Sequence, residues 1–308
     1  MSFATDVKDE ISDIRLSKSE YIAELSGFFR NNVHILDGNI VLYTENMLTS
    51  KRIYSLIKRL YGVHCYITTK QNNIFNKNNV FNIEIKDNVD FILKDLCVID
   101  ESGNELDSPK NYIVDGEAES IAYLRGAFMA KGSINDPATS QYHLEYLLDK
   151  KFESVFVQRL LNAYDLNSKI LIRENKYMVY LKDSEKIADF LKLIRATKAV
   201  LYYENTRALH EEKNAINRLN NCEQANIEKT IQSCNNQLKD IEKIEEELGI
   251  DILDEKLMVA AIYRKKYPET SLSELSEIIS LETETPISKS GLNHRFRKIH
   301  EIAVKIKK

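Results

Sequence analysis

The last 24 residues carry an excess of positive charge that could bind a polyanion. Segment 285–308 contains seven lysines and arginines and a single acid, Glu301. Earlier in the chain, segment 240–247 contains five acids and one lysine. The formal net charge of the whole chain is −4, so the positive charge is confined to its end. A basic segment of this kind is the electrostatic footprint of a nucleic-acid-binding protein.

The spacing of apolar residues in this segment predicts a helix that begins after Ser288. Pro286 precedes that helix, and serine is a preferred N-cap residue. The apolar residues form one continuous stripe that must pack on preceding helices: Leu292, Phe296, Ile299, Ala303 and Ile306. The side chains that we predict to contact DNA surround the first turns: Ser288, Lys289, Ser290, Asn293, His294, Arg295, Arg297 and Lys298.

This set of side chains suits a recognition helix, whose N-terminal residues contact base edges in the major groove. Asparagine pairs with adenine and arginine with guanine, while lysine and serine mainly anchor phosphates. The alternative is an ordinary basic surface helix, which would explain Lys305, Lys307 and Lys308 as partners of the helix dipole. It does not explain the cations of the first turns, because cations there oppose the dipole. We therefore favour duplex DNA as the partner.

The first two-thirds of the chain contain the same order of predicted elements twice. The elements of the first copy cover 21–31, 34–36, 40–43, 49–61, 63–69, 80–85 and 88–96. Those of the second begin near 117 and continue at 133–135, 142–148, 152–164, 169–173, 177–181 and 184–194. Each copy reads α-β-β-α-β-β-α. A duplication of this kind predicts an α+β domain with two related halves.

Gly27 and Gly126 occupy equivalent places in the first helix of each copy. Glycine inside a helix costs about 1 kcal/mol relative to alanine, so it needs a reason there. Two unrelated, tolerated glycines are one interpretation. Because the positions repeat, we favour close packing of the two helices through Ser26, Gly27, Gly126 and Ala127.

The remaining third of the chain is predicted to be helical. We place a duplicated domain at 1–205, with repeats at about 15–100 and 115–200, a helical linker at 206–236 and a helix-turn-helix domain at 237–308. The linker is rich in asparagine and charge, and we expect it to break near Asn220 and Asn221. Ser271 and Glu274 form a capping box that opens a further helix.

Composition and motifs exclude several classes of protein. The four cysteines show no metal-ligand spacing, and the start of the chain has no apolar stretch typical of a signal peptide. We therefore expect a soluble, cytoplasmic protein without cofactor or bound metal. No nucleotide-binding, hydrolase or zinc-protease motif occurs. His143-Leu144-Glu145 matches the first part of the zinc-deaminase signature, but its second part is absent.

Nearly the whole chain resembles the WhiA family of bacterial DNA-binding regulators. The stretches that carry the resemblance are Y-L-R-G-A-F-M-A-K-G-S-I-N-D-P (123–137), Y-H-L-E (142–145), N-R-L-N-N-C-E-Q-A-N (217–226) and P-I-S-K-S-G-L-N-H-R-F-R-K-I (286–299). The resemblance implies a domain with the fold of LAGLIDADG homing endonucleases, joined to a C-terminal helix-turn-helix. It also implies roles in cell division and chromosome segregation, in sporulation control in related bacteria, and a location at the nucleoid.

The resemblance also implies where nuclease carboxylates would stand, and this sequence lacks them. Aligning 25–33 and 124–132 with the nine-letter motif puts Asn32 and Lys131 at the two acidic positions. An amide and an ammonium cannot replace two carboxylates as ligands of a hard cation. We expect no catalytic residues and no nuclease activity. For Lys131, contact with a phosphate and simple solvation remain open.

Three functions therefore compete. The first is a DNA-binding regulator, either sequence-specific or nucleoid-associated, and not an enzyme. The second is an active metal-dependent homing-type endonuclease. The third is a protein-interaction adaptor that uses the degenerate nuclease domain to bind other regulatory or division proteins. The first and third are compatible with each other.

Overall fold

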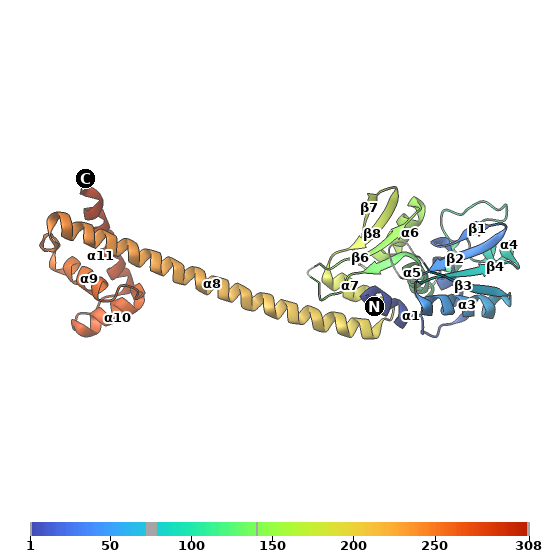
Figure 1. The fold of residues 1–308 in the computed structure, drawn as a ribbon, viewed down its shortest axis with the longest axis horizontal. Coiled ribbons are helices and arrows are strands. Elements are labelled where there is room, and N and C mark those ends of the chain that lie inside the picture. Colours follow the sequence, from blue (N-terminus) through green and yellow to red (C-terminus); the bar gives the residue numbers. More distant parts are fainter. Residues whose placement is uncertain (1, 72–78, 140, 307–308) are drawn as a thin grey trace. The chain divides into compact units, whose positions relative to one another are not determined.

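The computed structural model describes residues 2–71, 79–139 and 141–306. The chain divides into two compact units, Met1–His210 and Glu211–Lys308. Each has a hydrophobic core of its own. One long helix, α8 (Thr197–Leu248), contributes residues to both units. The first unit is an α+β domain and the second is helical (Figure 1).

The first unit contains the duplicated order of elements that the sequence predicts. The first half comprises α2 (Lys18–Arg30), β1 (His34–Leu36), β2 (Asn39–Thr44), α3 (Met47–Tyr61), β3 (Cys65–Gln71), β4 (Asn79–Ile85) and α4 (Val89–Asp95). A short 3-10 helix, η1 (Asn111–Ile113), precedes the second half. That half comprises α5 (Glu117–Lys131), β5 (Gly132–Ile134), β6 (Leu144–Leu148), α6 (Lys151–Ala163), β7 (Lys169–Arg173), β8 (Lys176–Leu181) and α7 (Ser184–Leu193).

The two halves form two antiparallel sheets with the same strand order, β1-β2-β4-β3 and β5-β6-β8-β7. A tight hairpin turn joins β1 and β2, in which Asp37 and Gly38 both have positive φ angles. Alternation in β2 turns Ile40 and Leu42 into the core, where helix α3 contacts β2, β3 and β4. Helix α6 packs on β6, β7 and β8 in the same way (Figure 1).

Helices α2 and α5 pack against each other through the two glycines, as predicted. A Cβ added to Gly27 would lie 2.2 Å from the carbonyl oxygen of Tyr123. A Cβ added to Gly126 would lie 1.9 Å from the carbonyl oxygen of Glu24. Both neighbours are backbone atoms, which cannot move aside as a flexible side chain can. The two helices therefore approach more closely than any other residue would allow.

Gly126→Ala is expected to destabilise the first unit by about 1–3 kcal/mol, because the added methyl group forces the two helices apart. The measurement is the free energy of unfolding in denaturant. Gly291→Ala is the matched control, because Gly291 lies in a helix of the second unit. A Cβ added there would lie 3.4 Å from Ser288 Oγ, an ordinary contact distance. That control should leave stability unchanged or raise it. Equal effects of the two substitutions would contradict the close packing.

A buried ion pair also joins the two halves. Arg30 Nε lies 2.9 Å from Glu153 Oε2, and both side chains are at most 3% exposed. The same arginine donates through Nη2 to the carbonyl oxygen of Leu106 at 2.8 Å. Asn31 and Tyr123 donate to the other oxygen of Glu153. Both charged groups are therefore fully hydrogen-bonded, which is the condition for burying charge without a large loss of stability.

Helix α1 (Phe3–Ile11) is an element that the sequence interpretation did not include. Ser2 caps it, and its apolar residues Phe3, Val7 and Ile11 are buried. A helix of 9 residues is too short to be stable alone, so packing on the rest of the unit must stabilise it. Glu10, near its end, accepts hydrogen bonds from the backbone amides of Lys198 and Ala199 at 2.7 and 3.0 Å. Helix α1 thus caps the first turn of α8.

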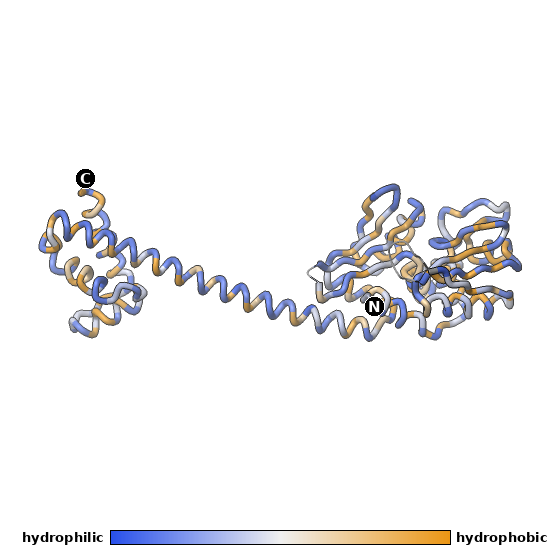
Figure 2. The backbone as a smooth tube through the Cα atoms, viewed as in Figure 1, coloured by the Kyte–Doolittle hydropathy of each residue, from blue (hydrophilic) through white to orange (hydrophobic). Residues whose placement is uncertain are grey.

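The predicted break near Asn220 and Asn221 is wrong, because α8 is helical throughout (Figure 2 shows its mostly hydrophilic course). Asparagine lowers helix propensity by only a fraction of a kcal/mol per residue, and no glycine or proline interrupts the segment. A helix also satisfies its own backbone polar groups in a segment with few apolar residues. The asparagines therefore reduce stability without ending the helix.

The second unit comprises the end of α8 and three further helices: α9 (Glu255–Lys266), α10 (Leu272–Glu282) and α11 (Lys289–Lys305). A short 3-10 helix, η2 (Ile250–Ile252), links α8 to α9. Helix α8 ends before Gly249, which has a positive φ angle, and the predicted capping box of Ser271 and Glu274 is confirmed. The core of this unit includes Ile241 and Ile244 of α8.

The described residues include no helix that is both long and apolar enough to span a membrane.

Candidate nucleic-acid interface

Helices α10 and α11 form a helix-turn-helix whose turn is fixed by hydrogen bonds. In the turn, Glu284 has a positive φ angle, and the backbone amide of Ile287 donates to Ser280 Oγ at 2.9 Å. Ser288 caps α11 as predicted, since its Oγ accepts from the Gly291 amide at 3.1 Å. The buried residues of α11 are those of the predicted stripe: Leu292, Phe296, Ile299 and Ala303. Burial of this stripe determines which side of α11 faces outward.

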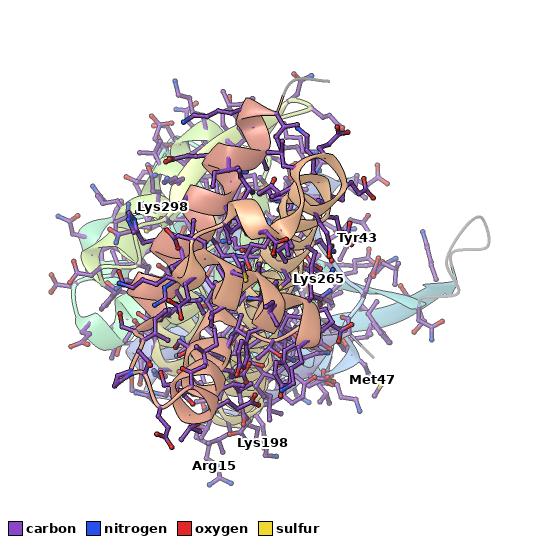
Figure 3. The ribbon with its side chains drawn as sticks, turned by 90° about the vertical axis from the view of Figure 1, so that its left-hand side faces the viewer. Arg15, Tyr43, Met47, Lys198, Lys265 and Lys298 are labelled. Carbon is purple, nitrogen blue, oxygen red and sulfur yellow. The ribbon has the colours of Figure 1, made fainter. Side chains whose placement is uncertain are left out.

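Most of the predicted site residues lie on that outward side. The exposed ones are Ser288, Lys289, Ser290, His294, Arg297 and Lys298. In the part of the chain that the structure describes, Lys289, Arg297 and Lys298 form no ion pair. The Lys298 side chain extends away from its helix (Figure 3). These cations are free to meet an external anion.

Two predicted site residues lie at the edges of this surface instead. Arg295 is partly buried, and its Nη1 donates to the carbonyl oxygen of Lys256 in the first turn of α9 at 3.3 Å. It therefore helps to hold α11 against α9. Asn293 is also partly buried and lines a groove of about 510 Å³ between α8 and α11.

The groove brings in polar residues of α8 that the sequence interpretation did not include. Lys229, Gln232 and Asn236 are exposed and line it together with Asn293 and Arg297. A signal for them was present, because segment 229–239 contains two lysines and no acid. The groove ends where His300 Nδ1 lies 2.8 Å from Asp240 Oδ2.

The end of α11 is capped by a residue of α8. Lys243 Nζ donates to the carbonyl oxygens of Ala303 and Ile306, at 2.8 and 3.2 Å. Lys305, predicted as a dipole partner, does lie in the last turn. The other two predicted dipole partners, Lys307 and Lys308, lie outside the described residues. The ammonium group that contacts the terminal carbonyls thus comes from the acidic end of α8.

The two degenerate nuclease positions both have structural partners. Asn32 is buried, donates to the carbonyl oxygen of Tyr43 at 2.7 Å and accepts from its amide at 2.8 Å. Lys131 Nζ lies 3.1 Å from Asp149 Oδ2, and Lys176 lies 3.2 Å from the other oxygen. Desolvation raises the pKa of Asp149, but hydrogen bonds and charge from the two lysines outweigh it and lower the pKa overall. Lys131 is therefore ion-paired, which neither open interpretation anticipated.

No three His, Cys, Asp or Glu side chains among the described residues are grouped so that they could hold a metal ion. The fold and this surface define a class of protein: a duplicated LAGLIDADG-like domain followed by a helix-turn-helix. Three family models match the chain. They describe the WhiA N-terminal LAGLIDADG-like domain at residues 18–99, the WhiA LAGLIDADG-like domain at 120–213 and the WhiA C-terminal HTH domain at 216–303. The chain belongs to the WhiA family.

Full-length relatives agree with this assignment. A "Probable cell division protein WhiA" from Exiguobacterium sibiricum is 41% identical over 312 residues, covering 100% of this chain and 97% of that protein. One from Enterococcus faecalis is 41% identical over 314 residues, covering 100% and 99%. The crystal structure of full-length DUF199/WhiA from Thermatoga maritima has a TM-score of 0.59 at 24% identity, with 100% of both chains covered. That structure shares the fold.

Proposed function

We propose that this protein is a regulator that binds duplex DNA through α11 and does not cut it. One observation carries the proposal: α11 exposes Lys289, Arg297 and Lys298, and none of them has an intramolecular ion-pair partner among the described residues. Lys289 lies in the first turn of α11, where a cation opposes the helix dipole, and Arg297 and Lys298 lie mid-helix, where the dipole gives a cation no stabilisation. An external polyanion gives them a role.

In the proposed complex, α11 lies in the major groove with its first turns against the base edges. Arg297 reads guanine, and Asn293 reads adenine from the edge of the groove. Lys289 and Lys298 contact phosphates, as do Ser288 and Ser290 at the helix N-terminus. His294 contributes one hydrogen bond, while Arg295 positions α11 on α9.

The test is a titration of duplex DNA with the full-length protein over a range of salt concentrations. The logarithm of the binding constant should fall linearly with the logarithm of the salt concentration. The steepness of this line, called the salt slope below, should be about 0.9 for each phosphate neutralised. Binding at low salt with no salt dependence would reject phosphate contacts. No binding to any genomic fragment would reject the function.

The absence of cleavage follows from the residues at the degenerate positions. Asn32 holds β2, and Lys131 would repel a divalent cation. We expect no cleavage when a plasmid library is incubated with the protein and Mg²⁺. Any reproducible cleavage would overturn this part of the proposal.

Lys229→Ala is expected to weaken DNA binding to a similar extent for all sequences and to lower the salt slope by about 0.9. The reason is its place on α8, where it flanks α11 and would contact a phosphate. Lys213→Ala is the matched control, since Lys213 is an exposed lysine of the same helix that does not line the groove. An equal change in both variants would exclude α8 from the interface.

Family membership supports a role for this DNA binding in cell division and chromosome segregation, and a location at the nucleoid. The relatives named above are called probable cell division proteins. Genome-wide mapping of bound DNA in cells that carry the wild type or a variant in α11 tests this role. A division defect that the α11 variant fully rescues would instead favour the protein-interaction adaptor.

A further inference from the structure

The first unit contains a cavity of about 1260 Å³ that the proposed DNA interface does not use. Helix α1, one face of α3, the segment before α2 and the beginning of α8 surround it. All of its lining residues belong to the first unit. Ligand pockets in proteins span about 300–1,000 Å³, so this cavity is large enough for a nucleotide-sized molecule.

Four exposed cations line this cavity: Arg15, Lys51, Arg59 and Lys198. Within the described residues, none of their side chains forms an ion pair or hydrogen bond. Lys51 and Arg59 lie two turns apart on the same face of α3, with Ser55 between them. Arg15 and Lys198 appear along the same edge of the unit in Figure 3. The cations therefore converge from three elements.

Three of the five acids in the cavity lining accept hydrogen bonds from neutral donors, which hold the carboxylates in place but leave their negative charge. Asp9 accepts from the Asn46 side chain at 2.6 Å, and Asp136 accepts from the Tyr202 hydroxyl at 3.0 Å. Glu10 caps α8. The buried guanidinium of Arg52 is ion-paired with Glu24, a carboxylate that it shares with Arg125. Asp6 and Asp13 are the other acids of the lining, so four of its five acids lie on α1 or just after it. Helix α3 contributes Lys51 and Arg59 to the lining and no acid, so an anion would bind on that side of the cavity.

Arg195 adds a fifth cation in an unusual backbone conformation. It follows α7 with a φ angle of +63°, where glycine is the common residue. Its side chain is 53% exposed, lines the cavity and lies 3.9 Å from the nearest carboxylate, that of Glu20.

We propose that this cavity binds a phosphate-bearing small molecule of nucleotide size, held by Arg15, Lys51, Arg59, Arg195 and Lys198. Phosphate oxygens form charge-assisted hydrogen bonds with guanidinium and ammonium groups, and those bonds are about twice as strong as neutral ones. A concave site encloses a small molecule on several sides. No residue of α11 lines this cavity, so the proposed small-molecule binding can be tested independently of DNA binding.

The experiment is isothermal titration of the full-length protein with ATP and, separately, with inorganic pyrophosphate. We expect saturable binding, weakened about tenfold or more by Lys51→Ala and by Arg59→Ala. Lys58→Ala is the matched control, because Lys58 is an exposed lysine of the same helix outside the cavity. No binding of either probe at millimolar concentration, or equal losses in Lys51→Ala and Lys58→Ala, would overturn the site.

Two further experiments test whether the cations of the cavity bind a small molecule or the phosphates of DNA. Lys298→Ala should leave ATP binding unchanged; loss of ATP binding in this variant would place the probe on α11 and overturn the proposal. Duplex DNA should not displace ATP, and Lys51→Ala should bind DNA as the wild type does. If DNA displaces ATP and Lys51→Ala weakens DNA binding, the cations form a DNA contact rather than a small-molecule site. Melting temperatures check that each variant is folded.

Discussion

The Arg297→Ala/Lys298→Ala double variant should bind its duplex DNA target about 2–4 kcal/mol more weakly than the wild type. Arg297 supplies the contact to guanine in the proposed complex, and its loss should relax specificity at one base pair. Lys298 neutralises one phosphate, so the salt slope should fall by about 0.9. Fluorescence anisotropy at several salt concentrations, with specific and random duplexes, measures both effects.

The matched control is Lys213→Ala/Arg218→Ala, which removes the same two charges from exposed positions of α8 within the same unit. It should leave the specificity unchanged and have little effect on the slope. If both double variants lose affinity equally, net charge determines binding and α11 is not the reading surface. Because both substituted residues of α11 are exposed, neither variant should lose its fold.

The largest expected effect on stability comes from Glu153→Ala, at about 3–5 kcal/mol. The substitution leaves the guanidinium of Arg30 buried without its carboxylate, and removes the acceptor of the Asn31 and Tyr123 side chains. Removing one partner lowers the free energy of unfolding by more than the intact pair contributes to it, because the remaining charge stays buried without a counter-ion. Denaturant unfolding of the first unit measures the effect.

Glu174→Ala is the control for this prediction. Glu174 is 86% exposed and lies 3.9 Å from Arg173, so its pair is a surface one. Such pairs contribute about 0–1 kcal/mol. A loss of less than about 1 kcal/mol in Glu153→Ala would show that water reaches Arg30 and that the pair does not hold the two halves together.

The order and type of most elements could be predicted because their patterns are local. Alternating residues such as Ile40 and Leu42 indicate strands, and the repeated glycines indicate the helix pair. Helix α1 was not predicted because its burial depends on contacts with distant parts of the unit. The break in α8 was expected from asparagine composition, which carries only a weak preference.

The candidate interface could be predicted only in part, for a related reason. Helical spacing identifies the outward face of α11, so Lys289 and Lys298 were assigned correctly to an exposed position. Spacing within one helix does not show which neighbours flank it. That is why the contact of Arg295 with α9 and the place of Lys229 beside α11 emerged only from the structure. The cations of the cavity are likewise scattered over three elements.

The buried pair between Arg30 and Glu153 also has a consequence for how the protein is made. The two residues are 123 positions apart, so the first half leaves the ribosome well before Glu153 exists. At about 5–20 residues per second, the delay is roughly 6–25 seconds. Pairing of two first halves with each other would be unfavourable, since that dimer would bury two copies of Arg30 without Glu153. The first half can therefore complete its packing only after its own second half has been synthesised. Until then the surface around Arg30 stays exposed, and a chaperone that covers it would protect the nascent chain.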